Sequence, residues 1–87
     1  MSADTLRRAA ALMREQYVLS TSHDSRACKS PTCQRRVFHH AVADWLMEVY
    51  CAETGEVIDG FAAAGPVGVS EGRHALAVAR AYLDGAA

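Results

Sequence analysis

Apolar residues recur at helical spacing in three segments of this chain, and this periodicity limits the fold more than any other feature of the sequence. The segments cover residues 3–19, 35–53 and 70–85. In each of them the apolar side chains form a stripe along one face of a helix, as they do in helices that share a core. The pattern therefore predicts a mostly all-α fold of three helices. With 87 residues the chain forms one domain, residues 1–87, because there is no room for a second core.

Capping residues mark the ends of these helices. Ser2 or Asp4 can accept hydrogen bonds from the first amides of the first helix, and Ser70 can do the same for the third. Gly55 lies just past the end of the second helix, and a glycine in this place is a common stop signal. The sequence therefore predicts where the second helix ends and where the third helix begins.

The second helix carries apolar residues on two sides. Its main stripe consists of Phe38, Val42, Trp45, Leu46 and Val49. The opposite side, called the Cys51 flank below, consists of His40, Asp44, Met47 and Cys51. A helix that is apolar on two sides is usually central in its domain or covers a second surface in an oligomer. We therefore expect the main stripe to organise the core and the Cys51 flank to bind a partner protein or a second copy of the chain.

Two connections join the helices. The first, residues 20–34, is polar, contains Pro31 and lacks apolar periodicity. It is long for a compact domain, which indicates either a function or an internal staple. The second, residues 56–69, carries a few apolar residues before Gly65-Pro66, and we expect it to be irregular or β-like.

Metal-ligating residue types gather in the long connection and at the start of the next helix. Two cysteines with four residues between them can bind one metal ion from a tight turn, which Pro31 would stiffen. A histidine before them and another from the following helix would complete a tetrahedral zinc site, and four protein ligands would make that zinc structural. The predicted ligands are His23, Cys28, Cys33 and His39, with His40 as the alternative to His39.

Other interpretations of these cysteines remain open. Cys28 and Cys33 could be plain thiols in a polar loop, or they could form a disulfide under oxidising conditions. Cys51 does not belong to the set, because 11 helical residues separate it from His40, a distance of about 16 Å. A nucleophilic Cys–His pair lacks a recognisable orienting acid and oxyanion turn, so we expect a protein that is not an enzyme.

The charges are divided between the two halves of the chain. Residues 1–40 hold seven Lys or Arg and three acidic residues, whereas residues 41–87 hold two and seven. Such asymmetry is compatible with a nucleic-acid face or with an acidic partner. We favour the simpler interpretation, in which the two halves attract each other within the fold, because the whole chain has a net charge of −1.

A small nucleic-acid-binding module stapled by zinc is the alternative function. Four basic residues surround the predicted metal turn and could contact phosphates: Arg26, Lys29, Arg35 and Arg36. However, no aromatic residue is interleaved among them, and the acidic second half would repel a polyanion. A membrane partner is not expected, since no apolar run approaches the roughly 18 residues that span a bilayer. The odd number of cysteines and the absence of a signal-peptide pattern predict a cytoplasmic protein.

Three helical segments of the chain resemble a known group of proteins. They are Thr5–Glu15 (TLRRAAALMRE), Ala41–Leu46 (AVADWL) and His74–Leu83 (HALAVARAYL). In this order they resemble small uncharacterised proteins encoded by bacteriophages of actinobacteria and by their hosts. The resemblance implies a helical scaffold and a phage or actinobacterial origin, without an activity. We therefore expect a non-enzymatic accessory protein that binds a host protein or a second copy of itself, with zinc as a structural cofactor.

Overall fold

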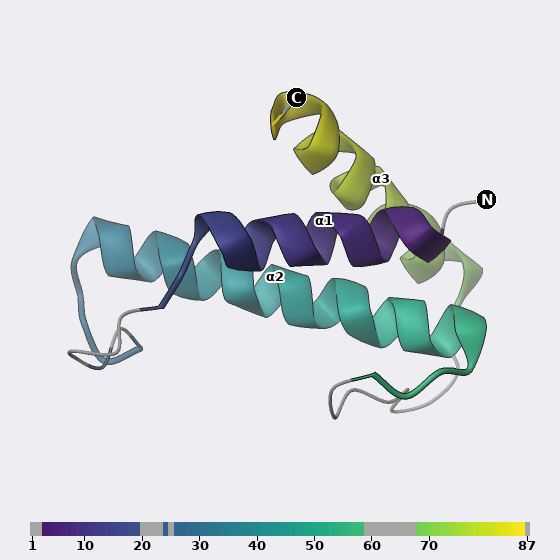
Figure 1. Cartoon of the computed structure of the whole chain (residues 1–87), viewed down its shortest axis with the longest axis horizontal. Coiled ribbons are helices and arrows are strands. Elements are labelled where there is room, and N and C mark those ends of the chain that lie inside the picture. Colours follow the sequence, from purple (N-terminus) through teal and green to yellow (C-terminus); the bar gives the residue numbers. More distant parts are fainter. Residues whose placement is uncertain (1–2, 20–23, 25, 59–67, 87) are drawn as a thin grey trace.

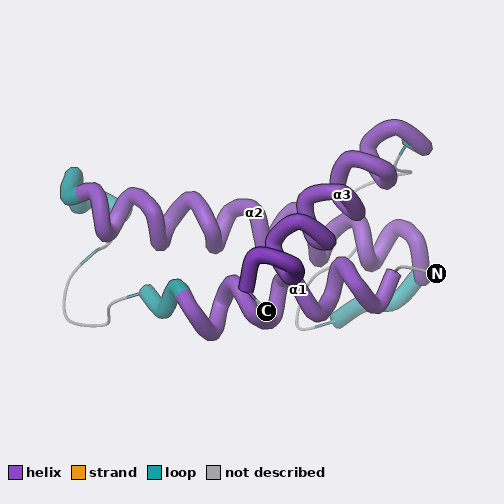
Figure 2. The backbone as a smooth tube through the Cα atoms, turned by 90° about the horizontal axis from the view of Figure 1, so that it is seen from above, coloured by secondary structure: helices purple, strands orange, loops and turns teal. Residues whose placement is uncertain are grey.

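The computed structural model describes residues 3–19, 24, 26–58 and 68–86 of the chain. Within these ranges the chain forms three helices, listed here in order: α1 (Ala3–Gln16), α2 (Pro31–Thr54) and α3 (Val69–Ala86). Helices α1 and α2 lie side by side and antiparallel, and α3 crosses them obliquely (Figures 1 and 2). The predicted all-α fold of three helices is confirmed. Most of the second connection, residues 59–67, lies outside the described residues, so its predicted β-like character stays a prediction.

Helix α1 forms because its sequence combines an apolar stripe with favourable end charges. Its buried residues have the spacing of one helix face: Leu6, Ala9, Ala10 and Met13. Asp4 lies in the first turn and Arg14 in the last turn, where each charge opposes the helix dipole. The helix ends at Gln16, three residues before the predicted end. The carbonyl of Tyr17 accepts a hydrogen bond from His40 Nε2 on α2, which replaces the partner that a further helical turn would provide.

Helix α2 begins four residues earlier than the periodicity predicts. Ser30 is its N-cap, with an extended backbone and a side-chain oxygen that accepts a hydrogen bond from the Cys33 amide at 3.2 Å. Pro31 occupies the first helical position, where its missing N–H costs nothing and its fixed φ suits the helix. The segment from Cys28 to Cys33 is therefore not the tight turn that the sequence predicted, because Pro31 and Cys33 both lie in the first turn of a helix.

The C-terminal end of α2 follows the predicted stop signal. Gly55 has a φ of +75°, in the left-handed region that glycine adopts without steric cost. Its amide donates to the carbonyl of Cys51 at 2.8 Å, which satisfies one of the last carbonyls of the helix. A side chain at this position would strain the backbone, so the glycine fixes where α2 ends.

The N-cap of α2 can be tested directly. We expect Ser30→Ala to lower the free energy of unfolding by about 1 kcal/mol, because the first-turn amide of Cys33 loses its acceptor. Ser30→Asp should retain most of the stability, since aspartate caps helices as well as serine does. Thr32→Ala, at an exposed position in the same turn, serves as the matched control. Urea unfolding measures the three variants, and equal losses for Ser30→Ala and Thr32→Ala would contradict the cap.

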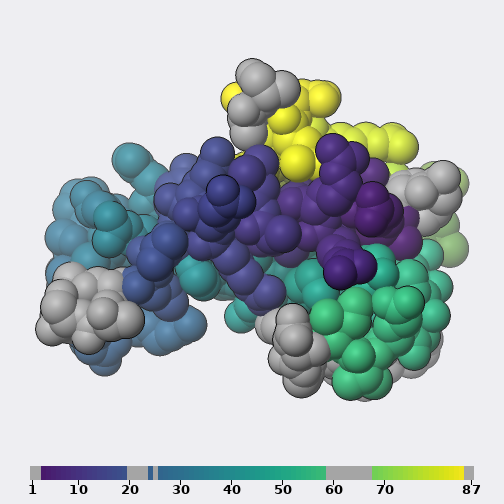
Figure 3. Space-filling model, in the orientation of Figure 1, coloured from purple at the N-terminus to yellow at the C-terminus, as the bar shows by residue number. Residues whose placement is uncertain are grey.

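The core lies mainly between α1 and α2. Helix α2 supplies six of the twelve residues of the buried cluster, α1 four and α3 two. Five cluster members are fully buried alanines, which let the helix backbones approach closely: Ala9, Ala10, Ala43, Ala75 and Ala79. Helix α1 contacts both of the other helices more extensively than these contact each other. In the space-filling view α1 covers the middle of α2 (Figure 3). The core is therefore organised by the α1–α2 pair, and not by α2 alone.

The two sides of α2 contribute to the core in a different way from the one that the sequence suggested. Leu46 and Val49 of the predicted core stripe are buried as expected, at 0% and 1% exposure. The Cys51 flank packs into the core, with Met47 and Cys51 buried. By contrast, Phe38 of the predicted core stripe is 63% exposed, and Val42 and Trp45 are half-buried. The physical reason is that α1, with its small alanines, packs against the Cys51 flank. The prediction that this flank binds a partner is wrong.

Helix α3 completes the domain at an angle to the other two. It begins one residue before the predicted cap Ser70, and its buried residues Ala75 and Ala79 face the core. Near its start, Glu71 Oε1 accepts a hydrogen bond from Trp45 Nε1 of α2 at 3.1 Å. Toward its C-terminal end α3 moves away from the α1–α2 pair (Figure 1). This divergence leaves a groove between α2 and α3.

Candidate functional site

The apolar groove lies between α2 and α3 and has a volume of about 480 Å³. Its lining residues come from all three helices: Met13, Phe38, His39, Val42, Trp45, Val78, Ala81 and Tyr82. Two of the large apolar side chains in it face solvent, Phe38 at 63% and Val78 at 39% exposure. A groove with solvent-facing apolar walls is the usual form of a surface that binds another molecule.

Helical spacing places the walls of this groove. Phe38, Val42 and Trp45 follow one another at i, i+4 and i+7, so they form a row along α2. Val78 and Tyr82 are four residues apart and form the facing row on α3. Met13, which is 2% exposed, belongs to the buried cluster and closes the groove from α1. The groove is thus a consequence of where α3 crosses, and it is built on helices and not on loops.

An aromatic cluster around His39 supports one wall. The His39 ring stacks on Tyr17, with ring centroids 3.7 Å apart and planes inclined by 12°. It also meets the edge of Phe38 at 5.5 Å and lies 6.0 Å from the Tyr82 ring. Its Nδ1 donates a hydrogen bond to the Arg35 carbonyl at 2.8 Å. These contacts fix the position of His39, so that Phe38 and Tyr82 are held on opposite sides of the groove.

Polar contacts hold α3 at both ends of the groove. Trp45 is bonded to Glu71 as described above, and the Tyr82 hydroxyl donates to Gln16 Oε1 at the end of α1. Burial, followed by the nearby phenol of Tyr17, raises the pKa of Tyr82 above its ordinary value. Tyr82 is protonated at neutral pH, as tyrosines ordinarily are, and the raised pKa extends its role as a donor to more alkaline pH.

A second hollow, called the basic hollow below, lies beside the start of α2 and has a volume of about 270 Å³. Its lining residues are Arg26, Cys28, Lys29, Gln34, Val37 and Phe38. A tight turn sets its wall, because the Asp24 carbonyl accepts from the Cys28 amide at 3.1 Å and Asp24 Oδ1 accepts from the Arg26 amide at 3.0 Å. Phe38 lines both the basic hollow and the apolar groove, so the two hollows adjoin.

The predicted metal ligands do not come together in the described part of the chain. His23 lies outside the described residues. Cys28 is half-buried with its Sγ 3.4 Å from Ser30 Oγ, whereas Cys33 is buried in the first turn of α2. His39 belongs to the aromatic cluster, and His40 donates to the Tyr17 carbonyl. Among the described residues no group of three His, Cys, Asp or Glu side chains is placed to hold a metal ion, and no disulfide joins the three cysteines.

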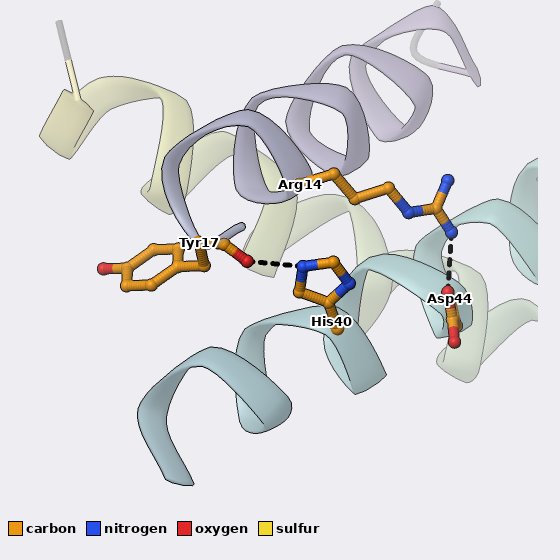
Figure 4. Close-up of polar contacts among 4 residues, drawn as sticks. All are labelled: Arg14, Tyr17, His40 and Asp44. Atoms are coloured by element: carbon orange, nitrogen blue, oxygen red, sulfur yellow. Dashed lines mark hydrogen bonds and ion pairs between the residues drawn. The ribbon is translucent and has the colours of Figure 1, made fainter. Parts of the chain in front are cut away.

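The charge division of the sequence contributes to the contact between α1 and α2. Arg14 Nη2 of the basic half lies 2.6 Å from Asp44 Oδ1 of the acidic half (Figure 4). Next to this ion pair, His40 reaches the carbonyl of Tyr17 (Figure 4). Both side chains are partly exposed, so the pair contributes at most about 1 kcal/mol. The position of this ion pair shows that part of the charge asymmetry contributes to the contact between α1 and α2. This agrees with the interpretation that the two halves of the chain attract each other.

The four basic residues of the nucleic-acid alternative are only partly brought together. Arg26 and Lys29 line the basic hollow, while Arg35 and Arg36 lie on α2, Arg36 half-buried. No aromatic residue is interleaved among them in the sequence, but the structure places the exposed Phe38 against the same hollow. The sequence pattern did not reveal this contact, because it depends on the early start of α2. That start puts Gln34 and Phe38 one turn apart on the same face of the helix.

Comparison with protein-family models, with curated proteins and with solved structures finds no match to this chain. Within the described residues, none of the three helices combines the length and the apolar character that crossing a bilayer requires. The functional interpretation therefore rests on the groove and the hollow themselves.

Proposed function

We propose that this protein is a non-enzymatic interaction module that binds a partner protein in the apolar groove. The observation that carries the proposal is the exposure of Phe38 and Val78 on facing walls of one groove. Exposed apolar side chains are ordinary when scattered, but they indicate a binding surface when they gather in a concavity. Grooves between two helices commonly bind a helix of another protein.

The roles of the nearby histidines agree with a binding function. His39 is held by its stack on Tyr17 and by its bond to the Arg35 carbonyl, and His40 caps the end of α1. Each of these contacts has a structural purpose in the fold. This use of both rings supports a scaffold for the groove and gives no reason to propose acid–base chemistry.

The biological setting that we propose is that of an accessory protein of phage or actinobacterial origin. It rests on the resemblance of the three helical segments, and it makes a host protein the natural partner. A second copy of the chain is the other candidate. Whether the partner is a host protein or a second copy, we expect it to contact α2 at the row of Phe38, Val42 and Trp45. It does not contact the Cys51 flank, which packs into the core.

The groove can be tested by adding a charge to it. We expect Phe38→Asp to reduce partner binding at least about tenfold, because a carboxylate in the groove must lose its water when the partner binds. Val18→Asp is the matched control, since Val18 has the same 63% exposure and does not line the groove. Affinity capture from host lysate, quantified by mass spectrometry, compares the two variants with the parent protein. Partners retained equally by both variants would contradict the proposal.

Binding of a single-stranded nucleic acid is the second candidate function. It is favoured by the exposed Phe38 next to Arg26 and Lys29, since a base can stack on an aromatic ring while basic side chains contact the phosphates. The acidic second half of the chain weighs against it. Retention of an oligonucleotide that weakens steeply with salt would favour this candidate.

A structural zinc ion remains part of the proposal for the segment from His23 to His40. We expect about one zinc ion per chain in protein purified without chelator, with loss of the metal in Cys28→Ser. The melting temperature should then fall by at least about 4 °C, the shift that roughly 1 kcal/mol produces in a small domain. Cys51→Ala should keep its zinc, because Cys51 is not in the predicted set. Elemental analysis that finds far less than one zinc per chain in the parent protein would rule out this part of the proposal.

A further inference from the structure

The apolar groove and the basic hollow form one continuous surface, and the charges at its two ends differ in sign. Phe38 lines both, so the basic side chains of Arg26 and Lys29 lie just beyond the Phe38 end of the groove. At the position of Trp45, the carboxylate of Glu71 lies 3.1 Å from the indole nitrogen. The surface thus carries positive charge at one end and negative charge at the other.

The length of the groove wall fits two turns of a helix. Phe38 and Trp45 are seven residues apart on α2, which corresponds to about 10 Å along the helix axis. An opposing helix presents apolar side chains over the same length when they occur at i, i+3 or i+4, and i+7. A row of this kind can pack between the α2 row and the facing Val78 and Tyr82.

The described part of the chain does not present a matching ridge for a second copy. Outside the groove, its exposed large apolar side chains are Val18, Val57 and Val69. They belong to three separate segments, the residues after α1, the residues after α2 and the start of α3. A concave surface needs a convex partner, so another protein is the better occupant.

We propose that the partner segment is an amphipathic helix whose apolar row enters the groove and whose acidic residues lie over Arg26 and Lys29. This inference rests on the proposed function and names the chemistry of the partner. Complementary charges at the two ends would set the direction in which the helix binds, because a reversed helix would place its acidic end against Glu71. The apolar row provides the affinity and the charged ends provide the selectivity.

The test uses a displayed library of helix-forming peptides, about sixteen residues long, with the apolar row fixed and both terminal turns randomised. Selection on the full chain is expected to enrich acidic residues in one terminal turn. Fluorescence anisotropy of an enriched peptide then measures the variants. We expect the charge-reversal pair Arg26→Glu and Lys29→Glu to weaken binding about tenfold, and replacing the peptide's acidic residues by glutamine to weaken it similarly.

Matched controls separate the charge effect from general disturbance. Arg8→Glu reverses an exposed charge on α1 outside both hollows and should leave peptide binding unchanged. Val18→Asp should also leave it unchanged, whereas Phe38→Asp should abolish it. Circular dichroism confirms that each variant keeps its helices.

Five outcomes would overturn the inference. Selected peptides with neutral or basic ends would contradict an acidic partner, and so would peptide binding that is unchanged by the charge reversal of Arg26 and Lys29. Neither of these results would contradict the proposed function. Salt-sensitive binding of an oligothymidylate that depends on Arg26 and Lys29, without peptide binding, would assign the surface to nucleic acid. Self-association that Phe38→Asp abolishes would assign it to a second copy. Failure of every peptide, together with lysate partners that Phe38→Asp retains, would reject the proposed function as well.

Discussion

Leu46→Ala is expected to lower the free energy of unfolding by about 3 kcal/mol, within the range of 2–5 kcal/mol measured for buried leucines. Leu46 is 0% exposed and is among the largest fully buried side chains, so its removal leaves a cavity between closely packed helices. A domain of this size has a total stability of roughly 4–13 kcal/mol. The variant therefore loses a large part of its stability, and its melting temperature should fall by more than about 10 °C.

The control for this prediction is Val57→Ala. Val57 is 72% exposed and follows α2, so its truncation should change the stability by less than about 0.5 kcal/mol. Thermal and urea unfolding followed by circular dichroism measure both variants. A loss of under 1 kcal/mol for Leu46→Ala would show that the α1–α2 interface is not packed as described.

Ala79→Leu is expected to have the second-largest effect, because α3 reaches the core through alanines. Ala79 is fully buried, and a leucine there needs space that the neighbouring helices occupy. Overpacking of this kind usually costs about 1–3 kcal/mol. We expect α3 to be displaced, which would weaken the hydrogen bond between Trp45 and Glu71 and change the fluorescence of Trp45.

Ala77→Leu provides a matched control on the same helix. Ala77 is exposed and two residues away, so the same substitution adds apolar surface without a clash. Helix propensity is almost the same for the two variants, since alanine and leucine are both strong helix formers. Urea midpoints and the Trp45 emission maximum distinguish them. Equal behaviour of Ala77→Leu and Ala79→Leu would contradict the close packing of α3.

The sequence predicted the three helices and the burial of Leu46 and Val49 on α2, but not the burial of the Cys51 flank or the exposure of Phe38. Periodicity locates an amphipathic helix because burial repeats every 3.6 residues. On α2 both sides are apolar, and counting apolar residues favoured Phe38, Val42 and Trp45. The deciding factors are tertiary ones, namely the small residues of α1 that accommodate Met47 and Cys51 and the bond from His40 to Tyr17. A single sequence does not contain this pairing.

The beginning of α2 could have been predicted from its capping residues. Ser30 followed by Pro31 is a combination that starts helices, but the polar residues around it favoured a loop. Once α2 starts at Pro31, Cys33 is a helical residue and Phe38 lies one turn beyond Gln34. The basic hollow follows from this register. Without the early start of α2, the sequence pattern indicated the basic residues but not their contact with Phe38.

The groove itself could not be predicted, because it depends on the angle at which α3 crosses. The sequence shows that Val78 and Tyr82 share a face of α3, and that Phe38 and Val42 share a face of α2. Whether the two faces close on each other is decided by alanines such as Ala75 and Ala79, which bring α3 against the core near its middle. The candidate site is thus a tertiary feature. It is made from residues predicted for the core, from His39, which was predicted as a metal ligand, and from residues without a predicted role.

The rate of thiol labelling tests most directly the claim that α2 buries Cys51 and exposes the Phe38 row. Phe38→Cys and Val18→Cys are prepared as separate variants, and peptide mapping by mass spectrometry follows each cysteine during reaction with a maleimide. We expect the thiols at positions 38 and 18 to react at rates within about tenfold of each other. Cys51, which is 1% exposed, should react at least about a hundredfold more slowly, because it must wait for the fold to open. Labelling of Cys51 as fast as the thiol at position 18, or a thiol at position 38 as protected as Cys51, would show that α2 is not oriented in this way.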